Sequence, residues 1–330
     1  MSRLLLLFVA GVAALNAQAP LGGPTLGFIF DAQGQALRPV LGIPGAAVFG
    51  DPLPAPSPLS YAAVSMRQTR AVVNDGAWKA IALSASGVTN TVALPGGLAA
   101  SARIAVSENG TSAAFYDAAN HALTVVTGIA TSSMAANPVS LDLLPGGITA
   151  LAAADDGSLL LSSSVPGGGE ALFWIGQDGS TRQLATLQKT SSILLWSSGA
   201  SALVADRAAN QIWGIQDPGG NAAITLLASD ADGVSGPAGA ALSRDGKQLW
   251  IANAGSRNVL GIDLGPRTAV SLDCGFDPTT LLPMADGVSF RLNHLRAGPL
   301  WILDTGAGSG PRVVFVPAVQ PADAGTEVAQ

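Results

Sequence analysis

The sequence predicts an all-β protein, a β-propeller of six four-stranded blades, or of seven if an N-terminal strand pair forms a further blade. One observation is the scarcity of charge: only 12% of the 330 residues are charged, with three lysines and three glutamates. An average globular chain is about 25% charged, and Lys and Glu normally coat exposed helix faces. The other observation is a pattern of apolar strands and tight turns that recurs along the chain. Both favour strands and turns over helices.

The N-terminus has the pattern of a secretory signal peptide over residues 1–19. Arg3 precedes an apolar run, Leu4 to Leu15, and small residues follow at Ala17 and Ala19. We expect cleavage after Ala19, or after Ala17 because a proline follows Ala19. A buried N-terminal helix is the alternative. The run is too short for a bilayer about 30 Å thick, so we expect an exported chain, periplasmic or extracellular, with no transmembrane segment after cleavage.

The propeller is expected over residues 20–319. It opens with a strand pair at residues 25–41, whose layout resembles the third and fourth strands of a blade. A composite seventh blade would need strands from both termini, and the C-terminal segment offers no spare strand. Residues 43–58 contain five prolines and are predicted as a linker. Residues 320–330 are predicted as a flexible polar tail.

Six repeats are drawn between residues 60 and 319. Each has a strand, a tight turn, a second strand ending in Asp or Asn, a third strand, a Gly-rich turn and a fourth strand. The first-turn glycines lie 47, 42, 47 and 41 residues apart, at Gly110, Gly157, Gly199, Gly246 and Gly287. A weaker copy, 61–94, lacks this glycine. Four strands repeating every 40–50 residues or so form a propeller blade, and such sheets bury their faces only by stacking, so we expect a ring.

Two kinds of residue recur at equivalent places in these repeats. Four of the six tryptophans fall on the third strand of a repeat: Trp78, Trp174, Trp213 and Trp301. Asp or Asn side chains end second strands, where they can accept hydrogen bonds from backbone N–H groups of the turn: Asp117, Asp206 and Asn253. This recurrence predicts a scaffold role for those polar side chains.

One segment, Ser243 to Asn253 (SRDGKQLWIAN), resembles the signature of YVTN-type propeller repeats, with Trp250 and Ala252 at its aromatic and small positions. The segments 206–212 and 117–123 are similar to the D-x-x-x-N turn of NHL-type repeats. The resemblance covers about residues 60–319 and implies a secreted bacterial propeller of the YVTN/NHL type. Because such propellers serve many functions, it implies a fold and no particular activity.

The charge and cysteine content exclude some functions. The formal net charge is −6 and no basic cluster occurs, so nucleic acid is not expected as a partner. Cys274 is the only cysteine, so an exported chain would have no internal disulfide and would depend on packing.

No catalytic residue, metal site or cofactor is predicted from the motifs. The two histidines, His121 and His294, follow second strands, where an exposed turn residue is expected, and two distant histidines cannot form a three-His zinc site. Residues 230–233 (DADG) have the opening of a calcium loop, but no glutamate follows nearby to complete it. We interpret this segment as an acidic turn between blades.

Ligand-binding candidates lie where the innermost strands end: Arg67, Glu108, Asp155, Ser197 and Arg244. If they point to the propeller axis, they line one mouth of a central channel; otherwise they are ordinary turn residues in water. Our first hypothesis is a secreted, monomeric, non-catalytic binding or scaffold module for a protein or carbohydrate ligand, which contacts loops on one face. The alternative is a channel-metal hydrolase of the lactonase type. A third hypothesis, suggested by a mean hydropathy of +0.40, is a cell-surface subunit held by a partner.

Overall fold

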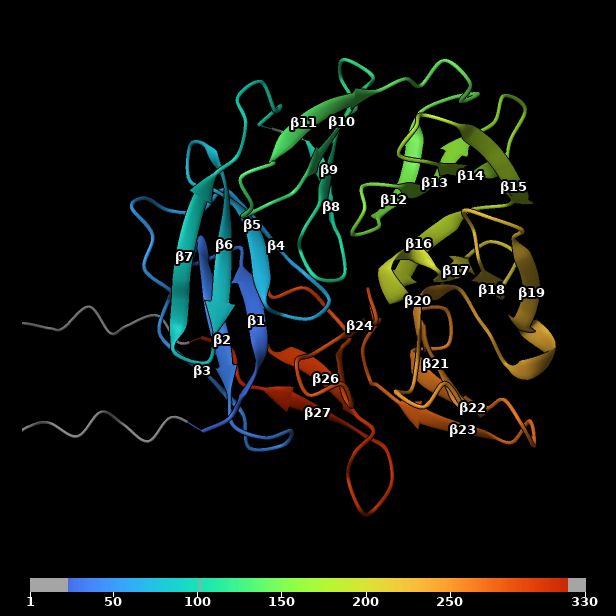
Figure 1. The fold of residues 1–330 in the computed structure, drawn as a ribbon. Coiled ribbons are helices and arrows are strands. Elements are labelled where there is room, and N and C mark those ends of the chain that lie inside the picture. The colour runs from blue at the N-terminus through green and yellow to red at the C-terminus, as the bar shows by residue number, and fades with distance from the viewer. Residues whose placement is uncertain (1–22, 101, 320–330) are drawn as a thin grey trace, which may run out of the picture.

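The computed structural model describes residues 23–100 and 102–319, which form seven sheets arranged in a ring (Figure 1). The predicted β-propeller is confirmed, with seven blades that we number 1 to 7 in chain order. Blade 1 has three strands and each of the others has four. The predicted signal peptide and the predicted tail lie outside the described residues. Among the described residues, no helix is long and apolar enough to cross a membrane.

The strands follow one another from the channel outward in every blade. Blade 1 consists of β1 (Thr25–Asp31), β2 (Ala36–Leu41) and β3 (Val48–Phe49). Blade 2 consists of β4 (Tyr61–Val64), β5 (Arg70–Asn74), β6 (Trp78–Ser84) and β7 (Gly87–Ala93). Blade 3 consists of β8 (Arg103–Val106), β9 (Ala113–Asp117), β10 (Ala122–Thr127) and β11 (Ala135–Val139). Blade 4 consists of β12 (Ile148–Ala153), β13 (Leu159–Ser164), β14 (Glu170–Ile175) and β15 (Thr181–Leu187).

The remaining three blades repeat this plan. Blade 5 consists of β16 (Thr190–Trp196), β17 (Ser201–Asp206), β18 (Gln211–Gln216) and β19 (Ala223–Ala228). Blade 6 consists of β20 (Pro237–Leu242), β21 (Gln248–Asn253), β22 (Asn258–Asp263) and β23 (Ala269–Asp273). Blade 7 consists of β24 (Leu282–Pro283), β25 (Ser289–Arg291), β26 (Leu300–Asp304) and β27 (Arg312–Val316). Two short 3-10 helices occur, η1 (Ser197–Gly199) and η2 (Asp230–Asp232).

The predicted repeat positions coincide with the observed elements. All five first-turn glycines separate a first strand from a second, with φ between 70° and 100°, a region that favours glycine. The four recurring tryptophans lie on third strands, namely β6, β14, β18 and β26.

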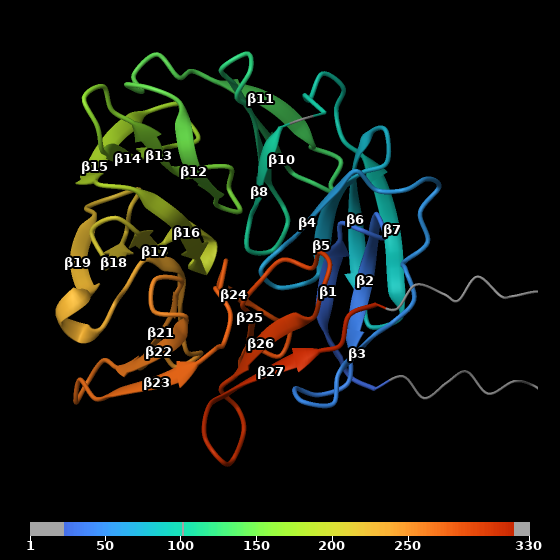
Figure 2. The ribbon, with the colours of Figure 1, turned by 180° about the vertical axis from the view of Figure 1, so that it is seen from behind.

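The place of the N-terminal strand pair differs from the prediction. β1 lines the central channel and β2 and β3 follow outward, so the pair supplies the first and second strands of its blade, not the third and fourth. The third strand comes from the segment predicted as a linker, and no described C-terminal strand joins this sheet (Figure 2). Every pair of neighbouring antiparallel strands shows the same alternation of apolar and polar residues and the same kind of turn. The local sequence pattern therefore could not determine which two strands of a blade residues 25–41 would form.

Seven apolar clusters hold the ring together, one between each pair of neighbouring blades. The ring closes where Ile29 and Val40 of blade 1 pack with Leu300 of blade 7, and the N–H of Ala285 donates to the carbonyl of Leu26 at 2.8 Å. A middle strand such as β17 is buried along its whole length because a sheet covers each of its faces. This burial accounts for the scarcity of charged residues.

Candidate functional site in the central channel

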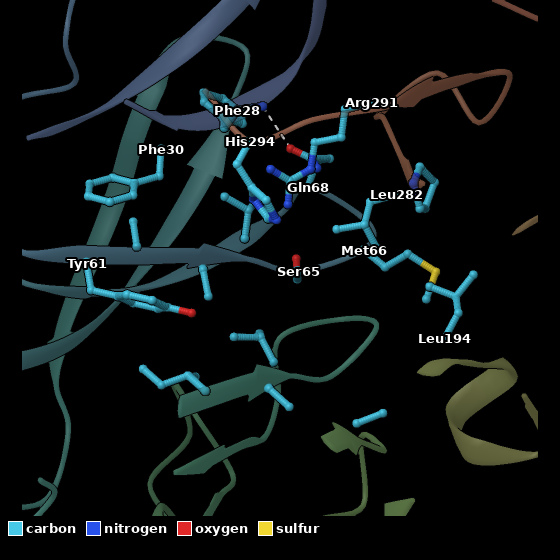
Figure 3. Close-up of a pocket in the computed structure, with 18 of the residues that line it drawn as sticks. Phe28, Phe30, Tyr61, Ser65, Met66, Gln68, Leu194, Leu282, Arg291 and His294 are labelled. Carbon is cyan, nitrogen blue, oxygen red and sulfur yellow. Dashed lines mark hydrogen bonds between the residues drawn. The ribbon is translucent and has the colours of Figure 1, made fainter. Parts of the chain in front are cut away.

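The inner strands enclose a cavity of about 520 Å³ along the propeller axis (Figure 3). Its walls come from β1, β4, β8, β12, β16 and β24, together with Arg291 and the connection between β25 and β26. Of the 25 lining residues, 19 are apolar, and the other six are Tyr61, Ser65, Gln68, Arg291, His294 and Arg296. A cavity of this size, with mostly apolar walls and few polar groups, has the construction of a small-molecule site.

The polar groups of this cavity differ in what they contact. Gln68 is committed to the scaffold, since its side-chain oxygen accepts a 2.7 Å hydrogen bond from the N–H of Phe28. Tyr61 comes from the start of β4, Arg291 from the end of β25 and His294 from the connection that follows (Figure 3). Within the described residues, these three side chains have no hydrogen-bonding or ion-pair partner, and all three face the cavity.

Burial in the channel shifts the titration of all three groups. It lowers the pKa of the Arg291 guanidinium to about 10, an effect that Tyr61 partly opposes. Burial, followed by the charges of Arg291 and Arg296, lowers the pKa of His294 to about 4. Burial raises the pKa of the Tyr61 phenol, although Arg291 and Arg103 act in the opposite direction. At pH 7 the cavity therefore contains a neutral imidazole, a neutral phenol and a guanidinium cation.

At one mouth of the channel the structure brings together Arg67 and Glu108, two of the predicted residues. Nη2 of Arg67 lies 2.6 Å from Oε1 of Glu108, and the Arg67 side chain is 65% exposed whereas that of Glu108 is 6% exposed. The other oxygen of Glu108 accepts from the N–H of Ser198 at 3.3 Å, which joins blade 3 to blade 5. The carboxylate therefore links three blades at this mouth.

Asp155 belongs to the same mouth and is held by blade 3. Its carboxylate accepts from the N–H of Asn109 at 3.0 Å, from Nδ2 of Asn109 at 2.6 Å and from Oγ1 of Thr111 at 3.0 Å. The Ser198 hydroxyl lies 3.4 Å away. Burial raises the pKa of Asp155, but hydrogen bonds from Ser107, Asn109 and Thr111 together bring it below its usual value.

Arg244 and Ser197 occupy different surroundings from those expected. Arg244 is exposed and lies with Asp245 and Lys247 in a shallow depression between blades 6 and 7, away from the channel cavity. Ser197 begins η1 with a φ of 53°, and its carbonyl accepts from the N–H of Ala200. The structure thus gathers Arg67, Glu108 and Asp155 and leaves Arg244 apart. Whether the gathered residues bind a ligand stays a prediction.

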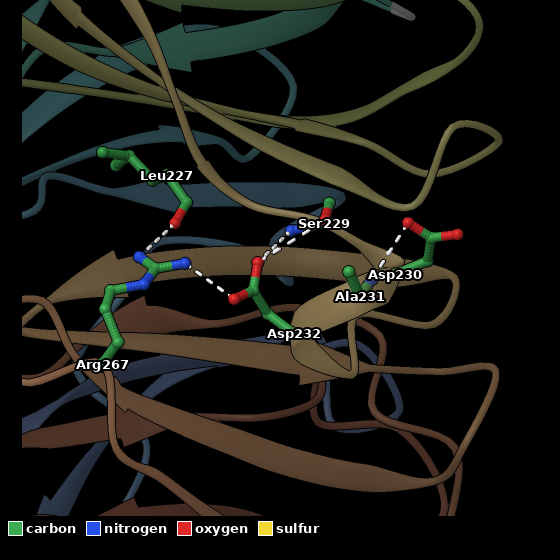
Figure 4. A network of polar contacts seen from close by, with 6 residues as sticks. All are labelled: Leu227, Ser229, Asp230, Ala231, Asp232 and Arg267. Atoms are coloured by element: carbon green, nitrogen blue, oxygen red, sulfur yellow. Dashed lines mark hydrogen bonds and ion pairs between the residues drawn. The ribbon is translucent and has the colours of Figure 1, made fainter.

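The acidic segment at residues 230–233 is a turn between blades 5 and 6, at η2 (Figure 4). Asp232 accepts from the N–H of Ser229 at 2.9 Å and from Nη2 of Arg267 at 2.7 Å. Arg267 also donates to the carbonyl of Leu227 at 2.8 Å. Asp230 accepts from the N–H of Ala231. These contacts fit the predicted role as an acidic turn. Among the described residues, no group of three or more His, Cys, Asp or Glu side chains is arranged to hold a metal ion.

The polar residues that end second strands behave as scaffold groups, as predicted. Asp206 is 1% exposed and accepts from the N–H groups of Gln188 and Lys189 at 2.7 and 2.9 Å. Asn253 is fully buried and accepts from the N–H of Ser235 at 3.1 Å.

The two histidines follow second strands and are both exposed, as predicted. His121 is an exposed turn residue whose Nδ1 lies 3.2 Å from the Tyr116 hydroxyl. The exposed His294 side chain also lines the central cavity, beside Arg291. Tyr61, Arg291 and His294 are site residues that the sequence patterns did not predict. One signal was available, because two arginines and a histidine fall within residues 291–296 of a chain poor in basic residues.

Comparison with known proteins identifies the fold and leaves the role open. No protein-family model and no curated protein matches this sequence. Among solved structures, virginiamycin B lyase from Staphylococcus aureus is similar with a TM-score of 0.54 at 15% identity, over 79% of this chain and 84% of that one.

Two further similar structures have different descriptions. A putative 6-phosphogluconolactonase from Bacteroides uniformis has a TM-score of 0.54 at 14% identity, over 89% of this chain and 97% of that one. The Cps50 (Swd1) β-propeller domain from Myceliophteria thermophila has a TM-score of 0.52 at 14% identity, over 90% of this chain and 97% of that one. At such identities the likeness shows a shared propeller fold, which hosts unrelated functions.

Proposed function

We propose that this chain is an exported, non-catalytic β-propeller that binds a small organic ligand in its central channel. The observation that carries the proposal is the cavity of about 520 Å³, apolar on most of its walls, with unpartnered polar groups at Tyr61, Arg291 and His294. Apolar walls supply affinity and a few polar groups fix orientation in sites of this kind. The proposal places the site in the channel, whereas a protein or carbohydrate partner, as expected from the sequence, would contact loops on one face.

The mouth residues support a binding role over the hydrolase alternative. Glu108 and Asp155 are the carboxylates that a channel metal would draw on, yet their oxygens already accept hydrogen bonds from Arg67, Asn109 and Ser198. Metal analysis of the purified protein tests the alternative. A stoichiometric divalent cation, lost in Glu108→Ala and Asp155→Ala, would overturn the non-catalytic proposal.

Export rests on the N-terminal pattern alone. We expect the chain recovered from outside the cytoplasm to begin at Pro20 or at Gln18, which intact-mass measurement distinguishes. The segment that resembles a YVTN-type repeat falls on the turn between β20 and β21 and along β21, which supports that repeat type for blade 6.

Ligand binding can be tested with N-phenyl-1-naphthylamine, a neutral dye that fluoresces in apolar surroundings. Ala63 lines the cavity from β4, so Ala63→Phe fills part of it. Ala93→Phe is the matched control, because Ala93 is exposed on β7, the outermost strand of the same blade. We expect the wild type and Ala93→Phe to bind the dye alike and Ala63→Phe to bind it at least about tenfold more weakly. No binding by the wild type, or equal binding by all three, would refute the channel site.

A further inference from the structure

The lining of the channel cavity has a charge opposite to that of the chain as a whole. The protein has a formal net charge of −6, yet the cavity lining contains two arginines, one histidine and no carboxylate. Random placement of charge would give such a lining an acidic bias. Positive charge within low-dielectric walls focuses the electrostatic potential on anions.

Arg291 is the unusual member of this lining. Four described arginines neither pair with a carboxylate nor donate a hydrogen bond from their side chain: Arg207, Arg244, Arg291 and Arg296. The other three are exposed to water, whereas Arg291 is half-buried at the wall of the cavity. A charge that loses part of its contact with water and gains no protein partner is destabilised. Its retention at the cavity wall is therefore explained by a partner that enters the cavity.

The neighbours of Arg291 add donors and no acceptor of comparable strength. The Tyr61 hydroxyl has no partner among the described residues and is close enough for its charge state to interact with that of Arg291. His294 lies beside Arg291 and, with a pKa of about 4, offers one N–H donor as a neutral imidazole at pH 7. A planar guanidinium suits a carboxylate, which takes two parallel N–H hydrogen bonds.

The rest of the cavity suits an apolar body attached to that anion. Phe28, Phe30, Leu194 and Leu282 line it, and their side chains lie around the polar group in Figure 3. Arg296, the other arginine of the lining, is exposed to water. The half-buried Arg291 is therefore the one cation that needs a partner, so the favoured ligand carries a single negative charge. Building on the proposed channel site, we infer that the ligand is an amphipathic organic carboxylate whose carboxyl group binds Arg291 and Tyr61 and whose apolar part fills the channel.

Calorimetric titration with octanoate and octan-1-ol tests this inference, because the two differ only in the head group. The variants are Arg291→Met, which removes the charge, and Arg244→Met as the matched control at an exposed arginine outside the cavity. We expect the wild type to bind octanoate at least about tenfold more tightly than octan-1-ol. Arg291→Met should lose about tenfold or more for octanoate and less than about threefold for octan-1-ol, and Arg244→Met should match the wild type.

Equal wild-type affinity for the acid and the alcohol would overturn the inference, and this comparison needs no variant to fold. An equal effect of Arg291→Met on both ligands would also overturn it, as would tighter binding of octyl phosphate than of octanoate. Dye binding in the channel without any preference for octanoate would refute this inference alone. Failure of the dye to bind the wild type would instead refute the proposed function.

Discussion

Replacing Gly261 by alanine tests how tightly the blades are packed. Gly261 on β22 lies directly opposite Trp250 on β21, and the Trp250 side chain is 2% exposed. A methyl group at position 261 would meet Cζ3 of the indole and would lie 2.8 and 2.9 Å from Cη2 and Cε3. The ring packs among Leu281, Phe290 and Leu303 between blades 6 and 7, so it has little room to move.

The expected cost follows from this geometry. Inserting a methyl group into a packed core costs about 1–3 kcal/mol, whereas Gly→Ala at an unhindered site usually stabilises by about 0.4–1 kcal/mol. We therefore expect Gly261→Ala to lower the free energy of unfolding by about 1–3 kcal/mol. Gly96→Ala is the control, because a Cβ there meets nothing within 4 Å, and it should leave stability unchanged or slightly raised.

Urea unfolding, followed by tryptophan fluorescence, measures these free energies when the slope of the transition is unchanged. Trp250→Leu removes the ring atoms that the new methyl group would meet. In that background the alanine at position 261 should cost less than about 0.5 kcal/mol, which gives a coupling free energy of about 0.5–3 kcal/mol. The reasoning is refuted if Gly261→Ala costs the same in both backgrounds, or if it behaves like Gly96→Ala.

Three further predictions concern charged groups and the thiol. Arg67→Met should lower the free energy of unfolding by about 1–3 kcal/mol, because it leaves a carboxylate that is 6% exposed without its cation. Glu108→Gln should lower it by less, because it leaves an arginine in water. A larger loss for Glu108→Gln than for Arg67→Met in urea unfolding would contradict this. The pKa of His294 is about 4 in the folded protein and about 6.5 in an unfolded chain. Because the unfolded chain takes up the proton at a higher pH, the free energy of unfolding should fall as the pH drops from about 6.5 to about 4. His294→Gln should lessen that fall, measured by unfolding at pH 7 and pH 4.5, and an NMR titration of His294 near pH 6.5 would argue against it. Burial, followed by the charge of Asp273, raises the pKa of the Cys274 thiol to about 11, so iodoacetamide at pH 8 should modify the folded protein much more slowly than the urea-unfolded protein, as intact mass would show.

The repeat could be predicted from the sequence because its signals are local. The positive φ of Gly110 and Gly246 and the third-strand position of Trp174 and Trp301 are set by neighbours within one blade. The place of residues 25–41 could not be predicted in the same way. Whether β1 is an inner or an outer strand depends on its packing against blade 2 and against blade 7, and blade 7 lies at the far end of the described residues.

The candidate site likewise contains residues that local sequence patterns predicted and residues that they did not. The ends of the inner strands could be read from the turns, and three of the predicted mouth residues do meet. Arg244 ends an equivalent strand, yet it faces a different depression, because the direction of an exposed side chain depends on what packs beside it. Arg291 and His294 line the channel in the blade whose first two strands, β24 and β25, are only two and three residues long. The connection after β25 also supplies the lining residues Leu295 and Arg296.

The sequence by itself determined the all-β class, the blade repeat, the turn glycines and the scaffold role of the buried Asx residues, since each follows from spacing and local hydrogen bonding. Only the tertiary structure decided that there are seven blades and that an acidic chain has a basic, apolar cavity at its axis. Both are properties of the closed ring. A ring places residues of blade 7 beside those of blades 1 and 2 around one cavity, and the sequence between blade 7 and the first two blades carries no signal of that contact.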